Sequence, residues 1–172
     1  MATGYAPSSM YRSREGMGVW EHRGKVAAVG VGHSPTERRW DEKPETSVGA
    51  WSIMALRNAI ADAGIAPDQV DGIVIVPETT TGAFWPDDKP LPQDVIEAFV
   101  QTNDPLDGIA KLSVDWLLKN MPELTNINYS VYAPVCMSNA LNVAAQVVGD
   151  GLAHTVLVLK AWYNLQGRYY QG

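Results

Sequence analysis

The sequence predicts an α/β fold: one layered domain in which a mixed sheet is flanked by helices. Two features of the pattern support this prediction. Short, continuous apolar runs rich in valine and isoleucine recur along the chain, which is typical of strands buried on both faces. Longer segments lie between them, and their apolar residues recur at three- and four-residue steps, as on one face of a helix. At 172 residues the chain is long enough for a single core.

The composition argues against several classes of protein. Apolar residues make up 46% of the chain and charged residues 19%, which is globular composition. The formal net charge of -6 disfavours a general nucleic-acid surface, because nothing offsets the repulsion of phosphates. No stretch approaches the roughly 20 apolar residues of a membrane-spanning helix, and the first residues lack a signal segment. The single cysteine permits no internal disulfide, so we expect a cytoplasmic protein without membrane association.

The domain is predicted to span residues 25–172. Residues 1–24 mix Gly, Ser, Tyr and Arg without periodicity, and we expect a flexible leader or an arm that contacts a partner. Residues 25–32 (KVAAVGVG) form a valine-rich run that predicts the first buried strand. A loop rich in Pro and charge follows.

A helix and a second strand come next. Residues 47–64 carry one apolar stripe, with Thr46 or Ser47 to cap its start and Gly64 to end it; the stripe is Ile53, Leu56, Ile60 and Ala63. Residues 71–77 (DGIVIVP) predict a buried strand. Strand, helix and strand in this order predict a βαβ unit with two parallel strands.

The middle of the chain is irregular. Residues 78–109 are rich in Pro and Asp, and we expect a long loop excursion that serves substrate binding or subunit contact. Residues 95–100 (VIEAFV) predict one or two helical turns within it. Residues 108–120 predict a longer helix that carries Leu112 and Trp116.

The last part returns to alternating elements. Residues 127–134 (INYSVYAP) predict a third strand, and a helix is expected to start near Ser138. The apolar stripe expected on this helix is Leu141, Ala144, Ala145 and Val148. Residues 154–162 (HTVLVLKAW) predict a fourth strand.

Two kinds of binding site are not supported. Gly30 and Gly32 follow a predicted strand, but the third glycine of a dinucleotide-binding turn is missing, and there is no GxxxxGK[ST] phosphate loop. The histidines are scattered and one cysteine forms no CxxC pair, so we expect no metal site.

Cys136 is the candidate catalytic residue. It lies between the end of a predicted strand and the start of a predicted helix, where unpaired backbone N–H groups and the helix dipole favour a thiolate. The N–H groups of Met137, Ser138 and Asn139 can also hold an oxyanion when a thioester carbonyl is attacked. The alternative is that Cys136 is a small buried hydrophobic residue without a chemical role.

The stretch CMSNALNVAAQVVGDGLAHTVLVL, residues 136–159, resembles the nucleophile segment of the thiolase family, which runs Cys-x-Ser-Gly, a small and apolar helix, Ala-Gly and an apolar strand. Two earlier stretches, KVAAVGVGHSPTERRW and AIADAGIAPDQVDGIVI, resemble the first thiolase strand with its loop and the following helix, turn and strand. The order agrees over most of residues 25–161. The branch that it resembles is the lipid-transfer or sterol-carrier type of thiolase, in its N-terminal half.

The resemblance implies a thiolase-like fold, a homodimer, and Cys136 as the residue acylated by a 3-ketoacyl-CoA. The expected enzyme is an acyltransferase that cleaves or forms a carbon–carbon bond. Coenzyme A is then an acyl carrier and cosubstrate, and no cofactor is bound permanently.

The sequence departs from the family pattern in three ways. Asn139 stands where members commonly have Gly, and KAWYNLQG replaces a Gly-x-Glu-x-Met-like stretch after the fourth strand. The histidine and second cysteine that the family's second half supplies have no match here. A second polypeptide, either a C-terminal half or an OB-fold protein, is therefore a possible partner.

Two alternatives to the acyltransferase remain. Relatives in the lipid-transfer branch act as retro-aldolases on acyl-CoA compounds with an OB-fold partner, and aldol cleavage needs a base and an enolate-stabilising site more than a nucleophile. Aromatic residues would suit a ring-containing substrate in that case: Phe84, Trp85, Tyr163, Tyr169 and Tyr170. The other alternative is a non-catalytic subunit that binds lipid or CoA.

Overall fold

The computed structural model describes residues 20–37, 40–76, 88–134 and 136–161. These residues form an α/β fold, as predicted, around a three-stranded sheet. The strands are β1 (Gly72–Val76), β2 (Tyr129–Tyr132) and β3 (Val156–Lys160). The helices are α1 (Val48–Ala63), α2 (Gln93–Ala98), α3 (Val114–Asn120) and α4 (Met137–Gly149), with short 3-10 turns η2 (Pro44–Thr46) and η3 (Pro67–Gln69).

The described part of the sheet is parallel throughout. Its strand order is β2-β1-β3, so β1 is central and pairs on both sides. All five residues of β1 are buried, which explains why its sequence, GIVIV, is continuously apolar instead of alternating. The strands predicted over residues 71–77, 127–134 and 154–162 are confirmed.

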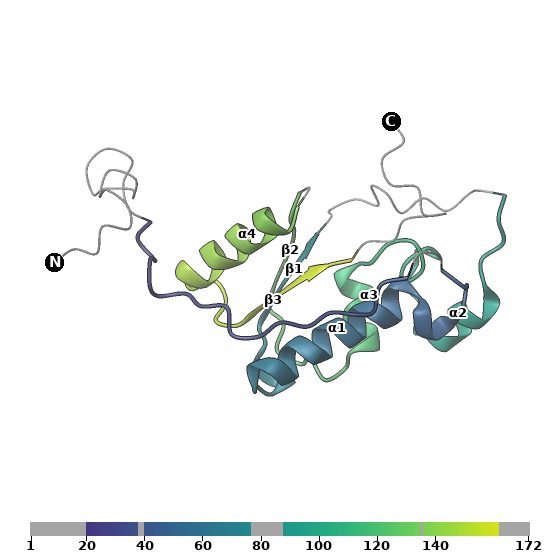
Figure 1. The fold of residues 1–172 in the computed structure, drawn as a ribbon, viewed down its shortest axis with the longest axis horizontal. Helices are drawn as coiled ribbons and strands as arrows, with labels where there is room; N and C mark the ends of the chain where they lie inside the picture. The colour runs from purple at the N-terminus through teal and green to yellow at the C-terminus, as the bar shows by residue number, and fades with distance from the viewer. Residues whose placement is uncertain (1–19, 38–39, 77–87, 135, 162–172) are drawn as a thin grey trace.

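The sheet separates two apolar layers. Figure 1 shows α4 on one side of the sheet and α1 with α3 on the other. On the α1 side, Leu157 and Leu159 of β3 join a core cluster around Trp116. On the α4 side, Val156 and Val158 of β3 pack with the small residues of α4. Successive residues of β3 therefore face opposite layers, as the pleat requires.

Helix α1 forms as the sequence predicts. Ser47 caps it, because its hydroxyl accepts a hydrogen bond of 3.1 Å from the Ala50 amide, and Gly64 ends it in the left-handed conformation. Ile53, Leu56 and Ile60 are buried, whereas Ala63 is half-buried. Helix α2 confirms the one or two helical turns expected near residues 95–100.

The first predicted strand, residues 25–32, is wrong. This segment runs along α1 instead of entering the sheet (Figure 1). Val29 and Val31 are 62% and 74% exposed. Gly30 and Gly32 permit a close approach, because a Cβ on either would lie within 2.4 Å of a carbonyl oxygen of α1. Both edges of β1 are occupied by β2 and β3, so the expected βαβ unit between residues 25 and 77 does not form.

The helices near residues 108–120 and 137–149 differ in detail from their predictions. Helix α3 begins only at Val114, because residues 108–111 form a turn closed by a hydrogen bond of 2.8 Å between Gly108 N and Lys111 O. The buried face of α4 is Ala140, Ala144 and Val147, and Leu141 is 50% exposed. The small side chains of Ala140 and Ala144 let this helix approach the sheet closely. The predicted stripe, which includes the larger Leu141, is therefore not the buried face.

Asp71 ties together the amino ends of the three strands. Its carboxylate accepts hydrogen bonds from the amides of His154 (2.9 Å) and Thr155 (2.8 Å), just before β3. Its carbonyl accepts from the amides of Asn128 (3.0 Å) and Tyr129 (3.2 Å), where β2 begins. Burial alone raises the pKa of Asp71, but the amides of Thr155 and His154 and the His154 ring outweigh it and lower the pKa below its usual value.

Among the described residues, no helix is long and apolar enough to cross a membrane. The proposed leader falls mostly on residues 1–19, and the first part of the loop excursion falls on residues 78–87; both lie outside the described residues.

Replacing Asp71 with Asn should lower the free energy of unfolding at neutral pH by about 1–3 kcal/mol, because the charged acceptor of two amides is lost. A carboxyl whose pKa is lowered on folding stabilises the fold above its unfolded-state pKa, about 3.9. That contribution is lost as the pH falls through the folded-state pKa, so wild type and Asp71→Asn should converge in acid. Urea unfolding across pH measures this, with the exposed Asp68→Asn as control; equal stability at pH 7 contradicts it.

Replacing Val147 with Ala should cost about 1–3 kcal/mol of unfolding free energy, because a buried side chain leaves a cavity under α4. Leu141→Ala on the same helix should cost less than about 0.5 kcal/mol, since Leu141 is half exposed. Urea unfolding of the two variants compares the packed face directly. A larger loss for Leu141→Ala would mean that α4 is rotated about its axis.

Candidate active site

Cys136 is the N-cap residue of α4 and is exposed. The segment that carries it leaves β2 along the central strand, where Ala133 N donates to Ile75 O at 2.8 Å. Cys136 has extended backbone angles, φ -144° and ψ 159°, and its carbonyl accepts from the amides of Asn139 and Ala140, both at 3.1 Å. The turn therefore holds the thiol at the carboxyl edge of the sheet, where α/β folds commonly bind ligands.

The surroundings of Cys136 favour its thiolate. Its Sγ lies 3.0 Å from the hydroxyl of Ser138. The pKa of the thiol is lowered first by this hydroxyl and then by the backbone amide of Asn139. Burial opposes them, and the Ser138 amide and the Lys160 charge make smaller contributions that also lower the pKa. The thiolate is the reactive form of cysteine, so the geometry prepares an accessible nucleophile.

The three residues predicted to hold an oxyanion lie differently from one another. Ser138 and Asn139 act on the thiol as described above, so their amides are in reach of a charge that forms there. The Asn139 side chain donates to Pro134 O at 3.3 Å and spans the turn that carries the thiol. The side chain of Met137 packs into the apolar layer between α4 and the sheet. The oxyanion role of all three stays a prediction.

No histidine accompanies the cysteine. His22 bonds to Asp150 at the far end of α4, and His154 bonds to Asp71 at the amino edge of the sheet. The carbonyl of His33 accepts from Asn58 of α1, on the opposite face of the sheet. A base that activates Cys136 therefore does not come from the histidines of this chain.

Lys160 is a site residue that the sequence analysis did not identify. It is the last residue of β3 and is exposed. Its charge lowers the pKa of Cys136, although the two residues are far apart in the sequence. Strand alternation in the sequence places residues 156, 158 and 160 on one face of the strand. The sequence did not show that α4 packs on that face.

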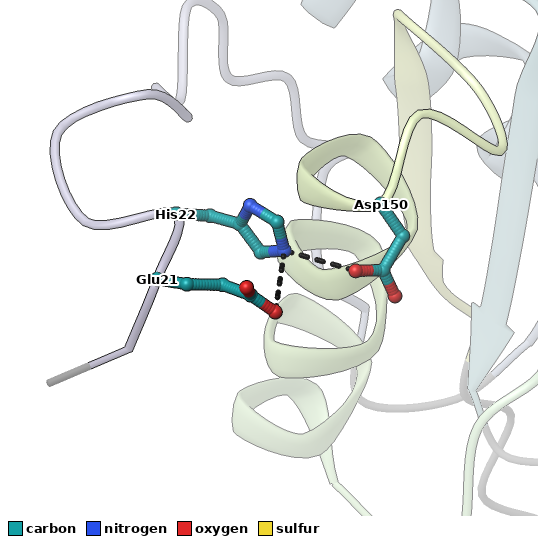
Figure 2. A group of neighbouring side chains, drawn as sticks. All are labelled: Glu21, His22 and Asp150. Carbon is teal, nitrogen blue, oxygen red and sulfur yellow. Dashed lines mark hydrogen bonds and ion pairs between the residues drawn. The ribbon is translucent and has the colours of Figure 1, made fainter. Parts of the chain in front are cut away.

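Glu21, His22 and Asp150 form a second cluster of polar groups, which Figure 2 shows. The His22 Nε2 lies 2.9 Å from Asp150 Oδ1 and 3.5 Å from Glu21 Oε1, and the three ligand atoms lie within 4.8 Å of one another. These groups could hold a cation. Asp150, however, already accepts two hydrogen bonds of 2.9 Å from Gln146.

We interpret this cluster as a tether. The indole of Trp20 donates to Gln146 at 2.9 Å, and the His22 ring lies against Gly149, where a Cβ would be only 2.4 Å from it. Residues 20–22 are thus fixed to the last turn of α4. The sequence analysis missed the cluster because Asp150 is 128 residues from His22.

The chain resembles solved structures in its fold. No family model and no curated protein matches it. The structure described as "Ltp2-ChsH2(DUF35) aldolase" is similar over 84% of this chain and 29% of that chain, with 21% identity and a TM-score of 0.51. The fold is thiolase-like. A priming β-ketosynthase from the R1128 polyketide biosynthetic pathway is similar over 78% of this chain and 41% of that chain, with 16% identity and a TM-score of 0.42.

This thiolase-like chain spans less than a third of the aldolase chain that it resembles. The aromatic residues expected to suit a ring-containing substrate lie outside the described residues: Phe84, Trp85, Tyr163, Tyr169 and Tyr170. Of the candidate site residues, the structure therefore describes Cys136 together with Ser138, Asn139 and Lys160.

Ser138→Ala should raise the pKa of Cys136, because its hydroxyl is the largest contribution to the lowered value. The fraction of thiolate near pH 7 then falls, and so should the rate of alkylation by iodoacetamide, whereas the rates should converge at alkaline pH where both thiols are ionised. The pH–rate profile measures this. Ser130→Ala, on the exposed side of β2, is the control; an unchanged profile for Ser138→Ala contradicts the assigned hydrogen bond.

Proposed function

We propose that this chain forms part of a thiolase-like enzyme that acts on acyl-CoA thioesters, with Cys136 as the nucleophile. The observation that supports this most is the exposed thiol at the start of α4, with a lowered pKa, at the carboxyl edge of a thiolase-like fold. An inert structural cysteine is expected to be buried among apolar side chains, and Cys136 is not.

In this proposal the thiolate attacks the ketone carbonyl at C3 of a 3-ketoacyl-CoA. The amides of Ser138 and Asn139 hold the oxyanion that forms. Collapse breaks the carbon–carbon bond, leaves an acyl thioester on Cys136 and releases the enolate of acetyl-CoA, which must take up a proton. The acyl group then passes to the thiol of coenzyme A; the reverse direction joins the acyl group to the acetyl-CoA carbanion.

The proton donor for the enolate is the missing component. The chain has one cysteine, and its three histidines lie away from Cys136. We propose that residues outside the described ranges or a second polypeptide supply it. A homodimer partner, a C-terminal half and an OB-fold protein are the candidates that the family resemblance implies.

A second function is favoured by one specific observation: the similar solved structure with a TM-score of 0.51 is described as an aldolase. In a retro-aldol reaction of the kind proposed for the lipid-transfer branch, a base removes the hydroxyl proton of an acyl-CoA substrate. The carbon–carbon bond then breaks without forming an acyl-enzyme. Cys136 would then line the site, and the helix amides would stabilise the enolate instead of a tetrahedral oxyanion.

The two functions differ in what happens at Cys136. Incubation with a 3-ketoacyl-CoA should leave an acyl group on the Cys136 peptide, detected by mass spectrometry, and Cys136→Ala should lower turnover by roughly a thousandfold or more. Ser130→Ala serves as the control. Turnover without an adduct, with activity retained in Cys136→Ala, contradicts the acyltransferase and supports the aldolase. If the chain binds CoA but shows no turnover by itself, and turnover appears only when a second polypeptide is added, the chain is a non-catalytic subunit.

A further inference from the structure

We propose that Lys160 is a positioning residue of this site, whose ammonium group stabilises the Cys136 thiolate from the carboxyl end of β3. The inference deepens the proposed function, which supplies the use for the thiolate. The geometry that supports it does not depend on which acyl-CoA reaction follows.

The pleat of β3 directs Lys160 toward α4. Val156 and Val158 pack in the apolar layer with Ala140, Ala144 and Met137, whereas Leu157 and Leu159 pack on the α1 side. Side chains two residues apart along a strand share a face. Lys160 therefore follows Val158 on the α4 face, one step nearer the carboxyl end of the strand.

The register of the sheet brings this end of β3 level with the start of α4. Lys160 is opposite Val76, the last residue of β1, and the next amide, Ala161 N, donates to Val76 O at 3.2 Å. On the other side of β1, Ala133 N donates to Ile75 O before the chain turns into Cys136. Helix α4 packs against β1 and β3, and its first residue, Met137, lies in the same apolar layer as Val158.

Among the described residues, Lys160 is the charged group that acts on Cys136 from another element. On α4 itself, Ser138 and Asn139 contribute neutral hydrogen bonds, and Asp150 lies at the opposite end of the helix. From β1 comes the apolar Val76, and from β2 the Tyr132 hydroxyl, which accepts from Val114 on the other face. Lys160 supplies the charge that lowers the pKa of the thiol.

This arrangement has a chemical consequence for the chain. The Ser138 hydroxyl, two amides and a cation favour an anion at Cys136 without a histidine, and the amides and the cation do not remove the proton themselves. Lys160 is also the first residue of KAWYNLQG, the stretch in which the chain departs from the thiolase pattern. The charged contribution differs from the neutral hydrogen bonds in one measurable way: salt screens it.

The test measures alkylation of Cys136 by iodoacetamide, an uncharged reagent, across pH and at low and high NaCl. Lys160→Met should slow alkylation near pH 7 by roughly two- to fivefold, as for an exposed charge pair, and move the pH profile upward. Lys160→Arg should keep the wild-type profile. Lys119→Met, on α3 across the sheet, is the matched control and should change nothing.

The salt dependence of alkylation provides a second readout, measured in the wild-type protein and in Lys160→Met. The wild-type alkylation rate near pH 7 should fall at high NaCl, and this salt effect should disappear in Lys160→Met. Equal profiles and equal salt effects in wild type and Lys160→Met overturn the proposal. This test uses no acyl-CoA, so it is independent of the incubation that looks for an acyl adduct. If Lys160→Met slows alkylation as expected but no acyl adduct forms in that incubation, the proposed covalent function fails and the role of Lys160 stands.

Discussion

The carboxylate of Asp71 is the interaction on which the arrangement of this domain depends. Parallel strands that are distant in the sequence share no turn that fixes their register. Asp71 supplies that constraint: its side chain holds the start of β3, and its carbonyl holds the start of β2. With the amino ends aligned and strands of similar length, the carboxyl ends reach one edge together. The position of the reactive thiol follows from this alignment.

The chemistry of the edge comes from groups that are individually weak. The hydroxyl of Ser138, the amides of the first turn of α4 and the charge of Lys160 each lower the pKa of an exposed thiol. Solvent reduces each contribution, and their convergence on one sulfur distinguishes Cys136 from an ordinary surface cysteine. The same amides serve an oxyanion or an enolate, so one scaffold is compatible with acyl transfer and with aldol cleavage.

Local features of the sequence were sufficient for several elements. The cap at Ser47, the left-handed Gly64 and the stripe of Ile53, Leu56 and Ile60 predict α1, because all of these interactions lie within one helix and its ends. The strand predicted over residues 25–32 is wrong because an apolar run indicates a preference for burial but does not identify the element it packs against. The segment lies on α1, and β1 has its two edges filled by other strands.

By itself the sequence determined the α/β class, the three strands, most helix positions and the place of Cys136 between a strand and a helix. Those features depend on periodicity and on residues next to one another. Only the tertiary structure decided which face of α4 is buried, that residues 20–22 are held at Asp150, and that Lys160 is on the face of β3 that packs against α4. These depend on strand order and register, which bring together groups that no local pattern relates.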